Sequence, residues 1–249
     1  MSAPAPLRLA VFGGSFDPVH EGHTEIARRA ERVFGIERVL WIPASIPPHK
    51  ADVELAPAPM RLAMLLIATA CRSEWEVSTM ELEREGPSYT YDTLLEVPDR
   101  VRHRLLPKKD GGLAARRREL ELYMILGSDN LSGLPLWKNV DDVLSIAQPI
   151  VVWRGGETED PLADLEGRLE DRALERLQRG FLRLPPLPQS STEIREALAR
   201  GEVPEGALSR PVLEFIVEKG LYGWPADAEL PADAGVTVGD ERGGTPGGE

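Results

Sequence analysis

The feature that most constrains the fold of this chain is the alternation of short apolar segments with stretches of helical periodicity. The apolar segments have the length of strands buried on both faces, and such strands belong to parallel sheets covered by helices. We expect strands at residues 8–11, 39–42, 76–78, 123–126, 150–153 and 181–184, and helices at 22–34 (capped by Gly35) and 60–71. The alternation predicts an α/β fold, a doubly wound parallel sheet with helices on both faces and a small C-terminal helical part.

Composition limits the classes of partner. The 249 residues include 29 Lys and Arg against 41 Asp and Glu, for a formal net charge of −12. This acidity argues against nucleic acid as a partner, because contact with phosphate backbones needs clustered basic residues. Cys71 is the single cysteine, which excludes a disulfide framework and a multi-cysteine zinc site.

The sequence carries no pattern of a membrane span or a signal peptide. The longest apolar stretch, residues 62–71, is about half of the roughly 20 residues that a membrane-spanning helix needs. The first residues, MSAPAPLRLAVF, lack the apolar core of a signal peptide. We therefore expect a soluble, cytoplasmic protein that makes no contact with a membrane.

Two segments depart from the alternation. Residues 99–119 carry a local net charge of +5, which indicates an exposed basic insertion. It is either a solvated surface segment or a contact for a partner or for a substrate phosphate. Residues 225–249 are rich in Gly, Pro and acids and contain no aromatic residue, so we expect a disordered acidic tail. Residues 1–224 then form one folded domain.

The most informative segment is GGSFDPVHEGH at residues 13–23, between the first strand and the first helix. Its glycines allow a sharp turn and a close approach of the backbone to a ligand. His20 and His23 are three residues apart, so both imidazoles lie on one side of a helical turn. A helix N-terminus at the same place favours anions. The glycines, the two histidines and the helix start together predict a polyphosphate site. The alternatives are a metal site, with Asp17 as a further ligand, and a structural role for both histidines.

Two further clusters follow predicted strands. PPHK at residues 47–50 offers Lys50, either a phosphate ligand or an ordinary surface lysine. SSTEIR at residues 190–195 has the capping-box pattern of a helix start, which alone explains it. Its hydroxyls together with Arg195 would also form an anion site at the sheet edge that carries the first cluster.

The segment after the strand at 123–126 combines an acidic and an aromatic candidate. Asp129 follows the strand directly and is well placed to accept hydrogen bonds from ribose hydroxyls. Trp137 either stacks on an aromatic ring of a ligand or fills the core, and the residues alone favour the core.

Together these segments resemble the nucleotidyltransferase superfamily marked by an HxGH motif, and within it the bacterial nicotinate-nucleotide adenylyltransferases. The resemblance covers about residues 8–224. Six segments carry it in the order of the family: GGSFDPVHEGH, IPASIPPHK, GPSYTYDTL, GSDNLSGLPLW, QSSTEIR and PVLEFIVEKGLY. Two positions depart from the pattern, Ser15 where Thr is usual and Gln189 where an apolar residue is usual.

The resemblance implies that residues 1–224 form a Rossmann-like catalytic domain. It implies a Mg²⁺-dependent step of NAD biosynthesis in which ATP and nicotinate mononucleotide give nicotinate adenine dinucleotide and pyrophosphate. The mononucleotide phosphate attacks the α-phosphorus of ATP in line, without a covalent enzyme intermediate. Mg²⁺ arrives with ATP, and no protein side chain is expected to hold a metal. The resemblance leaves a homo-oligomer open.

The resemblance also assigns roles to residues. The catalytic residues are His20, His23 and Arg195. The ATP-binding residues are Gly13, Gly14, Ser15, Phe16, His20, His23, Asp129, Ser191, Thr192 and Arg195. The mononucleotide-binding residues are Lys50, Tyr89, Thr90 and Trp137, with Trp137 stacked on the pyridine ring, against the preference drawn from the residues alone.

Three other functions are weighed against this one. A sibling enzyme would use phosphopantetheine or prefer nicotinamide mononucleotide, and the pantetheine enzymes lack the paired PPHK and SYTxDTL motifs. A class I aminoacyl-tRNA synthetase relative would need a KMSKS-like loop and a basic surface, and the sequence has neither. A non-catalytic nucleotide-binding module would be expected to have lost a motif histidine or arginine, yet all are present.

Overall fold

The computed structural model describes residues 5–45, 55–102, 118–153, 162–185 and 190–231. Six parallel strands form one sheet in the order β3-β2-β1-β4-β5-β6. The strands are β1 (Leu7–Gly14), β2 (Arg38–Pro43), β3 (Trp75–Val77), β4 (Leu120–Gly127), β5 (Gln148–Trp153) and β6 (Phe181–Arg183). The helices are α1 (Glu21–Phe34), α2 (Ala58–Thr69), α3 (Thr90–Arg102), α5 (Val140–Ile146), α6 (Asp171–Arg179), α7 (Ser191–Ala199) and α8 (Arg210–Glu218). Every predicted strand and both predicted helices are confirmed, with ends shifted by a few residues.

The sheet is doubly wound, as predicted. The chain builds outward from β1 to β3 and then returns to the other side of β1 with β4. Residues of β1 and β4 pair in parallel, with Phe12 opposite Ile125. The connections leaving these two neighbouring strands diverge, and that is the point of an open α/β sheet where ligands bind.

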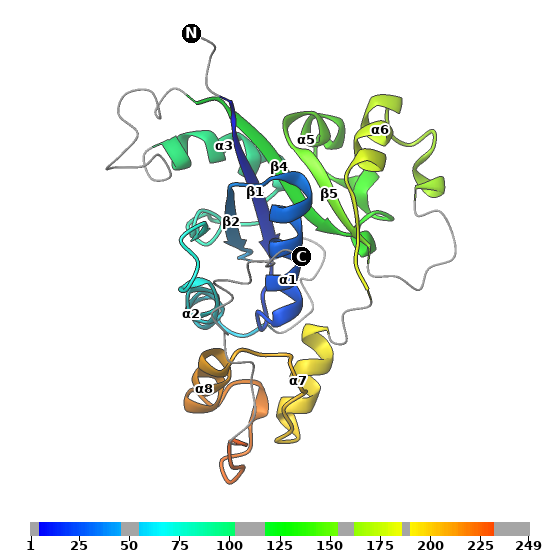
Figure 1. The fold of residues 1–249 in the computed structure, drawn as a ribbon. Helices are drawn as coiled ribbons and strands as arrows, with labels where there is room; N and C mark the ends of the chain where they lie inside the picture. The colour runs from blue at the N-terminus through cyan, green and yellow to red at the C-terminus, as the bar shows by residue number, and fades with distance from the viewer. Residues whose placement is uncertain (1–4, 46–54, 103–117, 154–161, 186–189, 232–249) are drawn as a thin grey trace, which may run out of the picture.

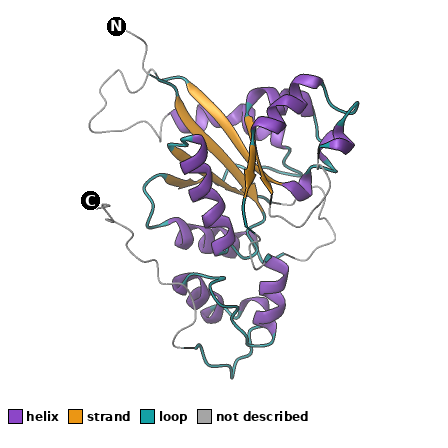
Figure 2. Cartoon of the chain, turned by 45° about the vertical axis from the view of Figure 1, so that its right-hand side comes forward, coloured by secondary structure: helices purple, strands orange, loops and turns teal. Residues whose placement is uncertain are grey.

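Side chains alternate along β1 between two cores. Ala10 and Phe12 pack into a core with residues of α1, α2, α7 and α8. Leu9 and Val11 pack into a second core with residues of α3, α5 and α6. Helices accordingly cover both faces of the sheet (Figure 2), and the two-sided burial explains why the strands are continuous apolar runs rather than alternating ones.

The C-terminal helical part lies beyond the carboxyl ends of the strands. Helices α7 and α8 are below the arrowheads of the sheet in Figure 1. The backbone N–H of Glu21, at the start of α1, donates to the carbonyl oxygen of Ala207 at 2.8 Å, which ties this part to the sheet. The predicted helical C-terminal part is therefore present, and it stands at the edge where ligands are expected.

The predicted tail does not leave the folded body at residue 225. Ala228 and Leu230 pack against the first core, and Arg210 Nη1 donates to the carbonyl oxygen of Pro231 at 3.0 Å. Composition averaged over 25 residues hides these two apolar contacts. The prediction of disorder for residues 232–249 concerns a segment outside the described residues.

The ends of the predicted basic insertion belong to the folded body too. Arg100 lies inside α3, and its guanidinium donates to Glu96 at 2.7 Å and to Glu83 at 2.8 Å. Arg118 donates to Glu37 at 2.6 Å. The glutamates that bond Arg100 and Arg118 all lie outside residues 99–119. The net charge of that segment alone therefore could not show that these arginines are paired. Residues 103–117 lie outside the described part of the chain.

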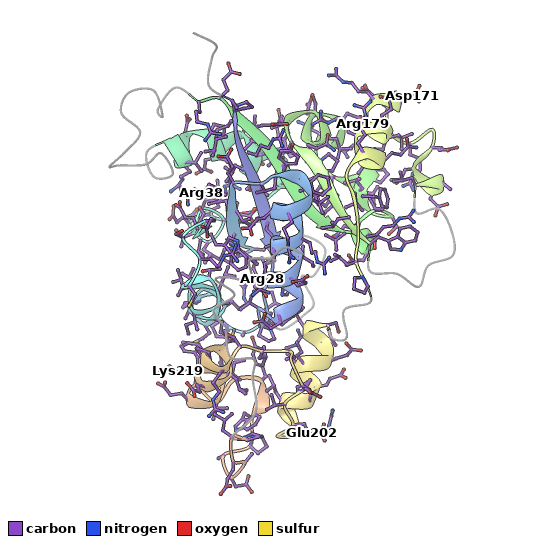
Figure 3. The ribbon with its side chains drawn as sticks, viewed as in Figure 1. Arg28, Arg38, Asp171, Arg179, Glu202 and Lys219 are labelled. Atoms are coloured by element: carbon purple, nitrogen blue, oxygen red, sulfur yellow. The ribbon has the colours of Figure 1, made fainter. Side chains whose placement is uncertain are left out.

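Some ionic side chains on the periphery pair with close neighbours in sequence. Arg179, Glu202 and Lys219 lie at the outer surface in Figure 3, and their partners are Glu175, Arg200 and Glu218 at 2.7–3.0 Å. Such exposed pairs contribute little to stability. No helix within the described ranges is long and apolar enough to span a membrane.

Candidate active site

The loop between β1 and α1 turns at Phe16 rather than at the glycines before it. Gly13 and Gly14 are the last residues of β1, whereas Phe16 has a φ of 49°, in the left-handed region that few non-glycine residues adopt. The Phe16 ring is 1% exposed and packs edge-on against Phe12 with centroids 5.6 Å apart. The sharp turn predicted at the glycines is thus made two residues later. The side chain of Phe16 belongs to the core, so only its backbone can meet a nucleotide.

Gly13, by contrast, leaves room for a ligand to come close to the backbone. Among the described residues, no atom lies within 4 Å of the position that a Cβ on Gly13 would take. The space beside Gly13 is therefore open, whereas a Cβ on Gly14 would meet the ring of Phe16 at 3.2 Å. The approach of a nucleotide to this backbone stays a prediction.

His20 and His23 lie against one another at the start of α1. His20 is the N-cap residue, with extended backbone at φ −144° and ψ 169°. The backbone N–H of His20 donates to Nδ1 of His23 at 3.2 Å, and the two ring centroids are 3.8 Å apart. The prediction that both imidazoles lie on one side of the turn is confirmed. Because Nδ1 of His23 accepts a hydrogen bond, the neutral ring carries its proton on Nε2, where it can be donated to an anion.

Helix α7 begins beside the same loop. Ser190 Oγ accepts from the N–H of Glu193 at 3.3 Å, and the Glu193 carboxylate accepts from the N–H of Ser190 at 2.7 Å. This is the capping box that the sequence predicts. The hydroxyl of Ser191 donates to the carbonyl oxygen of Pro18 at 3.2 Å. The structure therefore brings SSTEIR and GGSFDPVHEGH together.

Arg195 spans the junction between α7 and the β1–α1 loop. Its Nη1 donates to the backbone carbonyl oxygen of Asp17 at 2.7 Å, and its Nη2 donates to Oγ1 of Thr192 at 3.4 Å. The Arg195 side chain is 26% exposed. A guanidinium has five N–H donors, so groups remain that can donate to a ligand from a fixed position.

The carboxylate of Asp17 is fully buried beneath this junction. Its Oδ1 accepts from the hydroxyl of Tyr222 at 2.7 Å and from the N–H of Ala56 at 3.2 Å. The alternative of a metal site needs Asp17 as a ligand beside the histidines, and Oδ1 of this carboxylate already accepts from two protein donors. No cluster of three or more His, Cys, Asp or Glu able to hold a metal ion occurs in the ranges that the structure describes.

Arg61 is a buried support that the sequence analysis missed. It is 1% exposed, and its guanidinium donates only to backbone carbonyl oxygens. The acceptors are Ser15, Ala44, Ser45 and Ala56, at 2.8, 2.8, 3.2 and 3.0 Å. Burial lowers the pKa of Arg61, and the charge of Asp17 opposes that shift. Arg61 ties the β1–α1 loop to the loop after β2, and a basic residue within the apolar stretch of α2 gave no signal of this role.

Asp129 stands at the end of β4, next to the end of β1. It lies in a 3-10 turn, Ser128–Asn130, and is exposed. Its Oδ1 accepts from Nδ2 of Asn130 at 3.3 Å. A Cβ on Gly127 would collide with this carboxylate, so glycine is needed at the strand end for Asp129 to fold back. The position fits the expected contact with a ribose.

Three of the four residues predicted for the mononucleotide, Tyr89, Thr90 and Trp137, come from two segments that Lys138 joins. Lys138 Nζ donates to the carboxylate of Asp92 at 2.8 Å and lies 5.2 Å from the ring centroid of Tyr89. Tyr89 is 40% exposed, and Thr90 is the first residue of α3. Trp137, next to Lys138, is half-buried and packs against the second core. Part of Trp137 thus serves the core, and part remains accessible.

Lys50 and Gln189 lie outside the described residues, so their expected effects stay predictions. The residues that the sequence analysis missed are Arg61, Lys138 and Tyr222. Tyr222 falls inside the matching segment PVLEFIVEKGLY, which was the only signal for it.

The fold and the site together define a class of protein. A histidine pair at a helix start, a second helix start with an arginine, and an aspartate at the neighbouring strand end meet at one edge of a doubly wound sheet. The family described as "Cytidylyltransferase-like" matches residues 11–197, which include all of these groups.

Curated relatives narrow the class. The chain is 33% identical over 218 residues to a protein of Dehalococcoides mccartyi (strain ATCC BAA-2266 / KCTC 15142 / 195), covering 87% of this chain and 97% of the relative. It is 37% identical over 216 residues to a protein of Solibacter usitatus (strain Ellin6076), covering 87% and 100%. Both bear the name "Probable nicotinate-nucleotide adenylyltransferase". The chain belongs to this nicotinate-nucleotide adenylyltransferase family, within the cytidylyltransferase-like class.

Solved structures agree in fold. The nicotinic acid mononucleotide adenylyltransferase of Plasmodium falciparum, complexed with NaAD, matches with a TM-score of 0.59 at 18% identity, covering 88% of this chain and 99% of that one. The same protein complexed with APC gives a TM-score of 0.60 at 17% identity.

Proposed function

We propose that this chain transfers the adenylyl group of ATP to nicotinate mononucleotide by direct in-line attack. A phosphate oxygen of the mononucleotide forms a bond to the α-phosphorus while the bond from that phosphorus to the bridging oxygen of pyrophosphate breaks. A phosphate monoester is already a competent nucleophile near neutral pH, so no covalent enzyme intermediate is needed. The products are nicotinate adenine dinucleotide and pyrophosphate.

The observation that carries this proposal is the meeting of the histidine pair with the start of α7. His20 and His23, with ring centroids 3.8 Å apart, would donate to the phosphates that accumulate charge. Ser191, Thr192 and Arg195 would bind the β- and γ-phosphates. Catalysis of phosphoryl transfer consists mainly of aligning the reactants and stabilising charge with donors held in advance. The bonds from Arg195 and Ser191 to the β1–α1 loop fix the start of α7, which holds the other N–H groups of the guanidinium and of the helix start in place.

Mg²⁺ is proposed to arrive with ATP rather than on protein ligands. The one carboxylate beneath the phosphate site, that of Asp17, already accepts hydrogen bonds from Tyr222 and Ala56. When bound to the triphosphate, the ion neutralises charge on the leaving pyrophosphate. The chain's own residues orient the phosphates around it.

The other substrate groups are assigned to the neighbouring strand ends. Asp129 would accept hydrogen bonds from the adenosine ribose. Trp137 would stack on the pyridine ring, with backbone amides near Tyr89 and Thr90 facing its carboxylate, and Lys50 would add positive charge near phosphate. A cytoplasmic location is part of this proposal.

The proposal is tested by assaying the full-length chain with ATP, Mg²⁺ and each mononucleotide in parallel. We expect kcat/KM to be about 100-fold or more higher for nicotinate than for nicotinamide mononucleotide, because a site that bonds a charged group discriminates strongly against an analogue lacking it. Equal efficiencies would overturn the preference for the acid. Absence of dinucleotide from both would overturn the activity.

A further inference from the structure

We propose that Tyr222 is a positioning residue for the phosphate half of this site, which it serves by keeping the carboxylate of Asp17, a 3.8 Å ion-pair partner of Arg195, from forming a direct hydrogen bond to that guanidinium. The proposal rests on the proposed function, because it takes Arg195 to be a ligand of the ATP phosphates. Tyr222 lies 205 residues after Asp17, in the 3-10 turn Leu221–Gly223 that follows α8.

Asp17 is a competitor for Arg195 that is built into the site. Its Oδ2 is buried, has no hydrogen-bond partner among the described residues, and lies 3.8 Å from Nη1 of Arg195. A rotation of the carboxylate would bring an oxygen within bonding distance of the guanidinium. Carboxylate–guanidinium pairs are strong and frequently take two N–H groups at once. Such a pair would occupy the donors that a phosphate needs.

Two donors fix the carboxylate in the orientation observed. The Tyr222 hydroxyl at 2.7 Å and the Ala56 N–H at 3.2 Å both bond Oδ1. With Oδ1 held in this way, Arg195 bonds the backbone oxygen of Asp17 at 2.7 Å instead. The guanidinium is thereby oriented by a neutral carbonyl and keeps other N–H groups for a ligand.

Tyr222 is suited to this task by its surroundings. Burial, together with the charge of Asp17, raises the pKa of the Tyr222 phenol far above its usual range. The hydroxyl therefore stays protonated and remains a donor to the carboxylate. Tyr222 has a φ of 58°, a left-handed conformation that persists only where the surroundings over-determine it.

The test compares two matched variants of the full-length chain. Tyr222→Phe removes the hydroxyl at Asp17 and keeps the ring. Tyr123→Phe removes a hydroxyl that bonds Glu121 at 2.9 Å near the start of β4, at the opposite end of the strands. Calorimetry measures the Kd of a non-reacting methylene analogue of ATP, and steady-state assays give the KM for nicotinate mononucleotide. Circular dichroism and the Tm record the fold.

We expect Y222F to raise the Kd of the ATP analogue about tenfold, equivalent to about 1.4 kcal/mol of binding free energy. The KM for the mononucleotide should stay unchanged. Y123F should leave both constants unchanged. In an Arg195→Met background, Y222F should have no further effect on analogue binding, because the residue that it positions is gone. A general loss of stability would not produce this pattern.

Equal analogue affinity in Y222F and Y123F, or an undiminished effect of Y222F in the R195M background, would overturn the positioning role while leaving the proposed function intact. A wild-type chain that neither binds the analogue nor forms the dinucleotide would overturn the proposed function, and the role of Tyr222 with it.

Discussion

The hydroxyl of Ser191 donates a hydrogen bond to the carbonyl oxygen of Pro18 at 3.2 Å, although 173 residues separate the two in the chain. This bond fastens the start of α7 to the loop that leads into His20. The proposed phosphate site therefore combines two distant segments: one carries the imidazoles, and the other carries hydroxyls and a guanidinium.

Replacement of either histidine should lower kcat by about 100-fold to 1,000-fold, the loss typical of a removed donor to transition-state charge. Asn is the replacement of choice at His20, because it is also a preferred N-cap residue and preserves the start of α1. Turnover of His20→Asn and His23→Asn is measured at saturating ATP and mononucleotide, with the Tm as a control for folding. Near-normal turnover with an intact fold would remove that histidine from the mechanism.

Adjacent serines at the start of α7 should respond differently to truncation. Ser190 caps the helix, so Ser190→Ala should cost about 1 kcal/mol of stability and change the KM for ATP little. Ser191 bonds Pro18 and so joins the start of α7 to the loop before His20. Ser191→Ala should therefore loosen the proposed phosphate site and raise the KM for ATP several-fold. Chemical denaturation and steady-state kinetics on the same preparations separate the effects, and a reversed pattern would exchange the two roles.

Replacement of Trp137 should raise the KM for the mononucleotide and leave the KM for ATP unchanged. Trp137→Ala removes the accessible part of the indole, and the loss of a stacking partner is worth about 1–3 kcal/mol per base. The KM for nicotinate mononucleotide should therefore rise by tenfold or more, while the KM for ATP stays within twofold. Leu136→Ala is the matched control, because this neighbour is 76% exposed. An unchanged KM for the mononucleotide would restore the purely structural interpretation of Trp137.

Glu81 should make stability depend on pH. Burial raises the pKa of this carboxyl, while the hydrogen bond from Thr93 and the charge of Arg84 partly oppose the shift. The folded chain therefore binds the proton more tightly than the unfolded chain. The free energy of unfolding then falls as pH rises from the ordinary Glu pKa, about 4.3, through the raised value.

Glu81→Gln should remove this slope. It should be more stable than the wild type at pH 8 and equal to it near pH 3, well below the ordinary Glu pKa, where the wild-type carboxyl is protonated in both states. Urea denaturation at the two pH values measures the difference, with the exposed Glu85→Gln as the control. A wild type and an E81Q variant whose stabilities run parallel from pH 3 to pH 8 would contradict the expected burial of charge.

Local chemistry explains which features were predictable. The α1 pattern with Gly35 after it, and the Ser190–Glu193 capping box, concern atoms within one or two helical turns, and both are confirmed. The His20–His23 juxtaposition belongs here too, because the capping interaction between the N-cap residue His20 and His23, three residues later, brings the two rings together.

Features carried by long-range contacts were not predictable from the residues themselves. Arg61 looks like an ordinary surface residue of α2, yet it is buried and donates hydrogen bonds to four backbone carbonyl oxygens. Phe16 sits inside the motif, yet its ring belongs to the core. The contacts of residues 225–231 were hidden in the same way by a composition dominated by the rest of the tail.

The sequence by itself determined the α/β alternation, the helix starts and the set of residues with phosphate chemistry, because these depend on periodicity and on groups a few residues apart. The tertiary structure alone decided which carbonyl oxygen Arg195 bonds and how the hydroxyl of Tyr222 reaches the carboxylate of Asp17. Those relationships join segments more than 170 residues apart, and a hydrogen bond of 2.7 Å between such segments depends on how every intervening element packs.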